Sequence, residues 1–410
     1  MQTPPRGAIT VLLATIVVNM LGVGLAWPIL PKLIQQIEGG DVSSAAATYA
    51  WLAAIFAVAQ FLFSPVMGAL SDSFGRRPVI LVALAGLAID YAIMTVAPSL
   101  FWVAVARLVA GMFGAVVSTA NACMADMSTP ENRARHFGYL GAAFGVGFIA
   151  GPVIGGVLGE YDLRLPFLAA GVLAALNFTL AWFILPETHV RKNRAPFRTS
   201  EANPLKAFSR LTRYPVIAPL LVALFVTAVA QRGLESVWVL YADYRFGWSV
   251  RDAAFSLAFV GFMFVVVQGV LVGPVVNRFG EARVMAGGFA VSTAALACYM
   301  FADRGWMAYP LIAFHVLGNA LANPALTALC SRAVGVSEQG RLQGTLNAVN
   351  ALAVIAGPFL ASLLLAATTR PGVAPVWSGA WFGLCAVAFG VCAGLAVRRL
   401  RRDAPAQVRL

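Results

Sequence analysis

The sequence predicts an all-α integral membrane protein in which 12 transmembrane helices form two pseudo-symmetric six-helix bundles. Composition is the first reason: 60% of the 410 residues are hydrophobic and only 11% are charged, a balance that soluble globular chains do not reach. The second is that apolar runs long enough to cross about 30 Å of hydrocarbon as helix recur along the whole chain. The third is a faint internal repeat, which predicts that the two bundles are duplicated halves.

Twelve apolar runs account for the predicted spans, because polar or glycine-containing breaks separate each run from the next. They lie near residues 8–30, 46–70, 79–97, 100–123, 137–159, 165–185, 214–240, 253–275, 283–302, 306–333, 341–367 and 376–398. The first run has no small-residue cleavage site and is too long for the apolar region of a signal peptide. We therefore expect it to be a retained first helix.

The 29 lysine and arginine residues, which give the chain a net charge of +12, lie mostly in the loops between apolar runs. When the spans are threaded alternately through a membrane, most of these residues fall on one side, and the positive-inside rule assigns that side to the cytoplasm. We therefore expect both termini to be cytoplasmic. Membrane orientation also explains the positive charge without a nucleic-acid partner.

A long polar loop and a repeat divide the chain into halves. The predicted parts are a first bundle, a cytoplasmic linker, a second bundle and a cytoplasmic tail, at residues 1–186, 187–213, 214–400 and 401–410. The stretch Gly68–Val79 returns in a degraded form at Gly273–Arg283, and Gly151-Pro152 returns as Gly357-Pro358 at nearly the same offset. Matched halves predict a substrate path between them near the middle of the membrane.

The stretch Gly68–Val79 is a charged hairpin between two apolar runs. Gly75 permits a sharp turn, and the basic pair Arg76-Arg77 keeps the turn on the cytoplasmic side. Asp72 lies near a helix C-terminus, where the helix dipole disfavours a carboxylate, so it needs a cationic partner or a helix N-terminus. A carboxylate that joins two helix ends can act as a latch; a solvated turn with incidental charges is the alternative.

The fifth span carries small residues at intervals of four, namely Gly147, Gly151 and Gly155, followed by Gly156. This spacing lets two helices approach backbone to backbone, and Pro152 frees a carbonyl group and bends the helix. Close packing alone would account for the pattern.

Two charged residues lie within predicted spans of the first half, where insertion of each costs about 2.5–3.5 kcal/mol. Asp90, midway along the third span, is the strongest candidate for a group that exchanges protons. It could instead be a structural hydrogen-bond partner. Arg107, in the fourth span, is its natural counter-charge, although it could also bind substrate or be purely structural.

The second half carries a different polar set. Arg232 and Glu235 lie three residues apart on one face of the seventh span, and His315, Asn319 and Asn323 form a polar stripe on the tenth. The pair could line a cavity or lie near the outer surface, and the stripe could face a cavity or a neighbouring helix. The remaining cavity candidates are Asn19, Gln60, Asn121, Asn347 and the aromatic Phe264.

The chain lacks the residues that several functional classes of protein need. The chain has no P-loop for ATP, no nucleophile constellation and no cluster with metal-ligand spacing. We therefore expect a protein that is not an enzyme, has no resident cofactor or metal, and draws its energy from an ion or substrate gradient.

Two motifs resemble those of a known family. The pattern Gly-x-Leu-Ser-Asp-x-Phe-Gly-Arg-Arg-Pro-Val at Gly68–Val79 resembles the signature between spans two and three of the major facilitator superfamily of transporters. The pattern Gly-x-x-x-Gly-Pro-x-x-Gly-Gly at Gly147–Gly156 resembles the antiporter signature of its 12-span drug/proton antiporter branch. Stretches such as Asp90-Tyr91, Pro186-Glu187-Thr188 and Arg245-Phe-Gly-Trp248 extend the similarity to bacterial tetracycline/proton antiporters over nearly the whole chain.

The resemblance implies proton-coupled efflux of a drug-like molecule, tetracycline-type or multidrug, by alternating access across the bacterial inner membrane. It implies a monomer whose partners are a small-molecule substrate, protons and lipid, and a divalent cation only as cargo with a chelating drug. It makes Asp90 and Gln60 cavity residues and Arg107 a structural arginine. The residues that it implies for the latch are Gly68, Asp72, Gly75, Arg76, Arg77 and Asp126.

The chain departs from the family at three places where ionisable residues are usual: it has Asn19 in the first span, Phe264 in the eighth and Val291 in the ninth. Two further hypotheses therefore stand beside the drug exporter. One is a carrier of an anionic or zwitterionic metabolite that uses Arg107 or Arg232, and the other is a membrane receptor or scaffold that transports nothing.

Overall fold

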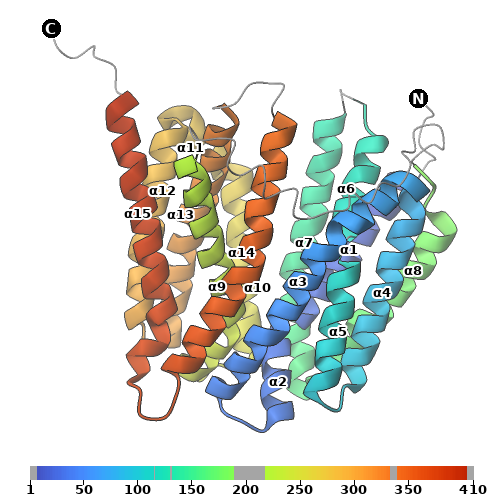
Figure 1. The fold of residues 1–410 in the computed structure, drawn as a ribbon, viewed down its shortest axis with the longest axis horizontal. Helices are drawn as coiled ribbons and strands as arrows, with labels where there is room; N and C mark the ends of the chain where they lie inside the picture. The colour runs from blue at the N-terminus through green and yellow to red at the C-terminus, as the bar shows by residue number, and fades with distance from the viewer. Residues whose placement is uncertain (1–6, 115, 130–131, 189–217, 333–338, 404–410) are drawn as a thin grey trace. The chain divides into compact units, whose positions relative to one another are not determined.

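The computed structural model describes residues 7–114, 116–129, 132–188, 218–332 and 339–403, and within these ranges every regular element is a helix (Figure 1). Twelve of the helical stretches are long and apolar enough to cross a membrane, which confirms the predicted fold class. The predicted linker 187–213 and tail 401–410 lie largely outside the described residues.

The helices before the linker are α1 (Ala8–Ala26), α2 (Leu30–Glu38), α3 (Val42–Phe74), α4 (Arg76–Val96), α5 (Leu100–Phe113), α6 (Val116–Asp126), α7 (Arg133–Tyr161) and α8 (Leu165–Ile184). Those after it are α9 (Ala218–Phe246), α10 (Val250–Val266), η3 (Val267–Leu271), α11 (Val272–Phe279), α12 (Glu281–Phe301), α13 (Gly305–Arg332), α14 (Gln339–Thr368), η5 (Pro375–Gly379) and α15 (Ala380–Asp403).

The helix ends follow local chemistry more than hydropathy. The first span extends to Glu38, beyond the predicted end at residue 30, because α2 resumes the helix with Pro31 in its first turn. It stops at Gly39, whose φ of 64° suits glycine. The eighth span contains a π-helical segment, η3, between α10 and α11.

The chain forms two compact units. The first contains residues 1–41, 51–204 and 249–258, and the second contains residues 42–50, 205–248 and 259–410. The beginnings of α3 and α10 are thus assigned to a different unit from the remainder of each helix. The predicted boundaries at the long loop stay a prediction.

The internal repeat is visible in how each unit packs. In the first unit, a Cβ placed on Gly151 of α7 would lie 2.7 Å from the Cα of Gly24 on α1. In the second unit, a Cβ on Gly357 of α14 would lie 2.6 Å from the carbonyl oxygen of Val229 on α9. The two repeated Gly-Pro landmarks therefore bring the fifth span of each half onto its first span, with no room for a side chain between the backbones.

The charged hairpin and its repeat also share one backbone geometry. Gly75, between α3 and α4, has φ 112° and ψ 161°, and Gly280, between α11 and α12, has φ 78° and ψ 153°. Both turns consist of a single residue in a region that favours glycine. The motif is therefore mostly helical, and Gly75 alone makes the turn.

A matched pair of substitutions on α7 tests the backbone contact. We expect Gly151→Ala to lower the free energy of unfolding by about 1–3 kcal/mol, because the added methyl group overlaps the α1 backbone. Gly141→Ala is the control, since a Cβ there meets no described atom within 4 Å. Thermal unfolding of the purified protein in detergent measures both, and equal stability of the two variants would contradict the packing.

Candidate functional site

The two intramembrane charges of the first unit are paired. Asp90 extends from α4 and Arg107 from α5, and a terminal guanidinium nitrogen of Arg107 donates to both carboxylate oxygens of Asp90, at 3.0 and 3.3 Å. The Asp90 residue is 1% exposed. The ion pair offsets much of the cost of holding either charge away from water, and removal of one partner would leave the other buried alone.

Other predicted cavity residues of the first unit stand apart from this pair. Asn19 is buried on α1, Gln60 is half-buried on α3, and Asn121 is exposed on α6. Gln60 lies near the C-terminal end of α5, because its amide nitrogen is 3.0 Å from the position of a Cβ on Gly114. Within the described residues, no hydrogen bond joins these three side chains to Asp90.

In the second unit, the polar residues of α9 and α13 form one connected network. Arg232 donates to one oxygen of Glu235 at 3.0 Å, and the amide of Gln231 donates to the other at 3.1 Å. The amide oxygen of Gln231 then accepts from His315 at 3.1 Å and from Asn319 at 3.3 Å. Asn323 donates to Asn319 at 2.6 Å and ends the chain of contacts.

Gln231 is the centre of this network, although it was not among the candidate residues predicted from the sequence. Its position one helical turn before Glu235 was the available signal. The other two candidates of this half, Phe264 on α10 and Asn347 on α14, are exposed and take no part in the network. No group of three or more His, Cys, Asp or Glu side chains in the described ranges could hold a metal ion.

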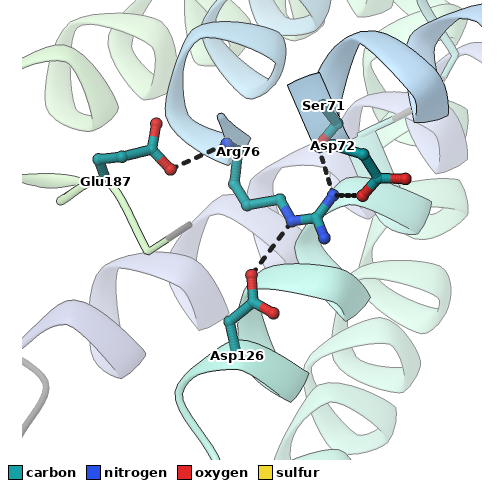
Figure 2. A network of polar contacts seen from close by, with 5 residues as sticks. All are labelled: Ser71, Asp72, Arg76, Asp126 and Glu187. Atoms are coloured by element: carbon teal, nitrogen blue, oxygen red, sulfur yellow. Dashed lines mark hydrogen bonds and ion pairs between the residues drawn. The ribbon is translucent and has the colours of Figure 1, made fainter. Parts of the chain in front are cut away.

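The hairpin motif forms a network around Arg76 (Figure 2). One terminal nitrogen of Arg76 donates to Asp72 and, at 3.0 Å, to the hydroxyl of Ser71. Its Nε donates to Asp126 at 3.1 Å, and its backbone N–H donates to Glu187 at 2.9 Å. The guanidinium group thus ties the end of α3, the start of α4 and the end of α6 together, as a latch requires.

The structure assigns different tasks to the two arginines of the motif. Arg76 provides the cationic partner that the sequence predicts for Asp72, whereas Arg77 donates to the backbone carbonyl of Trp182 near the end of α8. Gly68 is an ordinary position within α3. The contacts of Ser71 and Glu187 with Arg76 were not predicted from the sequence, although Pro186-Glu187-Thr188 is one of the stretches that carry the family resemblance.

The repeat of this latch in the second unit has reversed charges. Glu281 begins α12 as Arg76 begins α4, and Arg332 ends α13 as Asp126 ends α6. Arg332 contacts Glu281 at 2.8 Å, so the acidic and basic partners have exchanged positions between the halves. The side chain of Arg332 is 76% exposed, which limits what this pair adds to stability.

The small residues of the predicted antiporter motif all have close contacts within the first unit. A Cβ on Gly147 would lie 2.5 Å from the Cβ of Met20, and one on Gly155 would lie 2.5 Å from the carbonyl oxygen of Leu25. With Gly151 they form a continuous seam along α1, to which Pro152 also belongs through its contact with Gly24. Gly156 lies outside the seam and faces Ala254.

In the described residues, twelve apolar helices and a repeated hairpin form an architecture that is common among secondary transporters. The family model described as Major Facilitator Superfamily matches residues 12–272 and 266–410. The chain therefore belongs to the major facilitator superfamily, and its motifs and relatives assign it to the drug/proton antiporter branch.

Several characterised proteins are similar over most of the chain. The class C tetracycline resistance protein of Escherichia coli is 40% identical over 387 residues, covering 94% of this chain and 96% of the relative. The class G protein of Vibrio anguillarum is 35% identical over 390 residues, with 94% and 96% covered. Multidrug resistance protein 2 of Bacillus subtilis is 31% identical over 360 residues, with 86% and 88% covered.

Solved structures support the fold. A bacterial homologue of the human lysosomal transporter Spinster, in an inward-facing conformation, matches with a TM-score of 0.74 at 16% identity, over 98% of this chain and 99% of the other. The human organic anion transporter MFSD10 matches with a TM-score of 0.67 at 23% identity, over 97% and 99%.

The contacts of Arg76 and Arg77 predict that transport is more sensitive to a lysine substitution of Arg76 than of Arg77. We expect Arg76→Lys to reduce transport roughly tenfold, because one ammonium group cannot reproduce the forked contacts with Ser71, Asp72 and Asp126. Arg77→Lys is the matched control, since an ammonium group can also donate to the carbonyl of Trp182. Initial rates of drug uptake into everted vesicles measure both; equal losses in the two variants would contradict the assignment.

Proposed function

We propose that this chain exports a tetracycline-type drug in exchange for protons and that Asp90 is the proton carrier. The observation that carries the proposal is the buried Asp90–Arg107 pair, an ionisable couple inside a span of a drug/proton antiporter. The tetracycline resistance proteins that resemble the chain over more than nine-tenths of its length support the choice of drug.

The pair suggests how proton binding affects the protein. While Asp90 is ionised, Arg107 and Asp90 neutralise each other. A proton on Asp90 removes its negative charge and leaves Arg107 as a buried cation without a counter-charge, which is costly in a low-dielectric interior. This cost favours any conformation in which Arg107 contacts water or an oxygen of the substrate. Arg107 already has a buried Nε without a hydrogen-bond partner among the described residues.

The structure disfavours a carrier of organic anions. That hypothesis requires Arg107 or Arg232 to bind a substrate carboxylate, but each arginine already contacts an internal carboxylate, Asp90 and Glu235 respectively. A substrate anion would have to displace that carboxylate and leave it unpaired. The proteins named above that share 31–40% identity with the chain are resistance proteins, whereas the human organic anion transporter MFSD10, at 23% identity, supports the fold alone.

The proposed setting is the bacterial inner membrane, with both termini and the Arg76 latch on the cytoplasmic side, as the distribution of basic residues suggests. We further propose that the protein acts as a monomer and that a divalent cation enters the site only together with a chelating drug. We also propose that the protein has no nucleic-acid partner, because membrane orientation accounts for the distribution of its basic residues.

The vesicle experiment tests the proposed function. In everted vesicles with an acidic interior, we expect tetracycline to elicit proton efflux from wild type and at least a tenfold smaller response from Asp90→Asn, because an amide cannot carry the proton. Asp162→Asn is the control, since Asp162 accepts a hydrogen bond only in an exposed loop. Protein levels in the membrane are compared, because Asp90→Asn leaves Arg107 unpaired.

A panel of substrates distinguishes drug export from the transport of organic anions. Cationic dyes and organic anions are added in place of tetracycline under the same conditions. A response to tetracycline that persists in Asp90→Asn would remove Asp90 as carrier, and a response to organic anions alone would overturn the choice of drug export.

A further inference from the structure

The network of the second unit contains a carboxylate that the proposed mechanism does not use. Glu235 is 25% exposed at its side chain, and both of its oxygens accept hydrogen bonds, one from Arg232 and one from Gln231. Glu235 and His315 are thus the titratable groups that this network offers.

The direction of every hydrogen bond in the network follows from the charge on Glu235. An ionised carboxylate can only accept, so Gln231 must turn its NH2 group toward Glu235 and its oxygen toward His315 and Asn319. Because an amide oxygen can only accept, His315 must donate from Nε2. In a neutral imidazole Nδ1 then carries no proton, and this atom is buried without a hydrogen-bond partner in the described structure.

Protonation of Glu235 reverses this order. Arg232 can only donate, so it holds one oxygen of Glu235 as an acceptor and leaves the proton on the oxygen that faces Gln231. The Gln231 amide must then turn its oxygen to Glu235 and its NH2 group to His315. His315 must accept at Nε2, so it releases the Nε2 proton to water and takes up a proton from water at Nδ1, and Asn319 and Asn323 rotate their amides to match.

Packing contacts hold the backbone of α9 and the imidazole of His315 in place around the network. Trp381 donates from its indole nitrogen to the carbonyl of Ala230 at 3.3 Å, and its ring lies against Gly233. The imidazole of His315, which is 5% exposed, lies edge-on to Phe389 at 5.9 Å between ring centroids. The first response to a change in charge at Glu235 is therefore amide rotation within the network.

Few other charges lie near this site. In the part of the chain that the structure describes, α14 has no ionisable side chain between Gly344 and Thr368, and η5 has none. The ionisable groups of α13 and of α15 up to Val397 are Tyr309, His315, Cys330, Arg332, Cys385 and Cys392. Of these, only His315 contacts the network, and it does so through Gln231, so Arg232 is the charged group in direct contact with Glu235.

We propose that Glu235 is a second proton-binding site of this transporter and that Gln231 transmits its charge state to His315 as a change of tautomer. The proposal rests on the proton-coupled function proposed above, but its site is in the other unit, and it can be tested without drug or transport.

The chain has three histidines, so nitrogen NMR can isolate His315. In full-length protein labelled with 15N-histidine and carrying His136→Gln and His189→Gln, we expect the Nε2–H tautomer at alkaline pH and the Nδ1–H tautomer as pH falls. Glu235→Gln mimics the protonated carboxyl, because Arg232 holds its oxygen and leaves its NH2 group toward Gln231. In this variant His315 should show the Nδ1–H tautomer throughout the pH range.

Infrared titration of the same protein supplies an independent measurement. The C=O band of a protonated carboxyl group should appear on acidification, remain in Asp90→Asn and be lost in part in Glu235→Gln. Glu160→Gln is the matched control, since Glu160 also pairs with an exposed arginine, Arg251, but belongs to the other unit. A tautomer in Glu235→Gln that follows pH as in wild type, or a band unchanged by that substitution, would overturn the proposal. Loss of drug-driven proton efflux in Asp90→Asn with both signals intact would leave each proposal separately supported.

Discussion

The organisation of both units depends on the cost of placing charge in hydrocarbon. An ionised side chain within a span must have a partner, because neither lipid nor a dry interior can solvate it. Asp90 and Arg107 satisfy this requirement between two helices, whereas Arg232 and Glu235 satisfy it within one helix and pass the remaining hydrogen bonds to α13. The same pairing makes each carboxylate responsive, because a proton on it changes what its arginine and amide neighbours can contact.

The two halves share the backbone geometry of their glycine turns but differ in the signs of the charges beside them. Gly75 and Gly280 keep the same kind of backbone turn, because side chains other than hydrogen are disfavoured at these values of φ. The ion pairs that follow the two glycines have opposite polarity, Arg76 with Asp126 and Glu281 with Arg332. The attraction between two charges does not depend on which helix carries which sign, so polarity is free to differ where backbone geometry is not.

Close backbone contacts join pairs of helices within each unit. Glycines of α7 and α14 let their helices touch α1 and α9 with no side chain between them. Such contacts are stiff and specific in position, so a shift of α7 or α14 must carry its partner helix, while hydrogen bonds in the polar networks can exchange partners locally. An antiporter needs this combination, because binding of one proton must alter a whole unit and not only its nearest neighbours.

From the sequence alone, hydropathy predicted the twelve spans, and glycine chemistry predicted the turn at Gly75 and the close helix contact at Gly151. The cost of a lone buried charge made Arg107 one candidate partner of Asp90, with other roles left open, and the structure shows the pair. Tertiary structure decided that Arg76 rather than Arg77 binds Asp72 and Asp126, and that Gln231 joins Glu235 to His315. These choices depend on the rotation of each helix about its axis and on its height relative to its neighbours. Packing between distant segments sets both, and no stretch of sequence contains them.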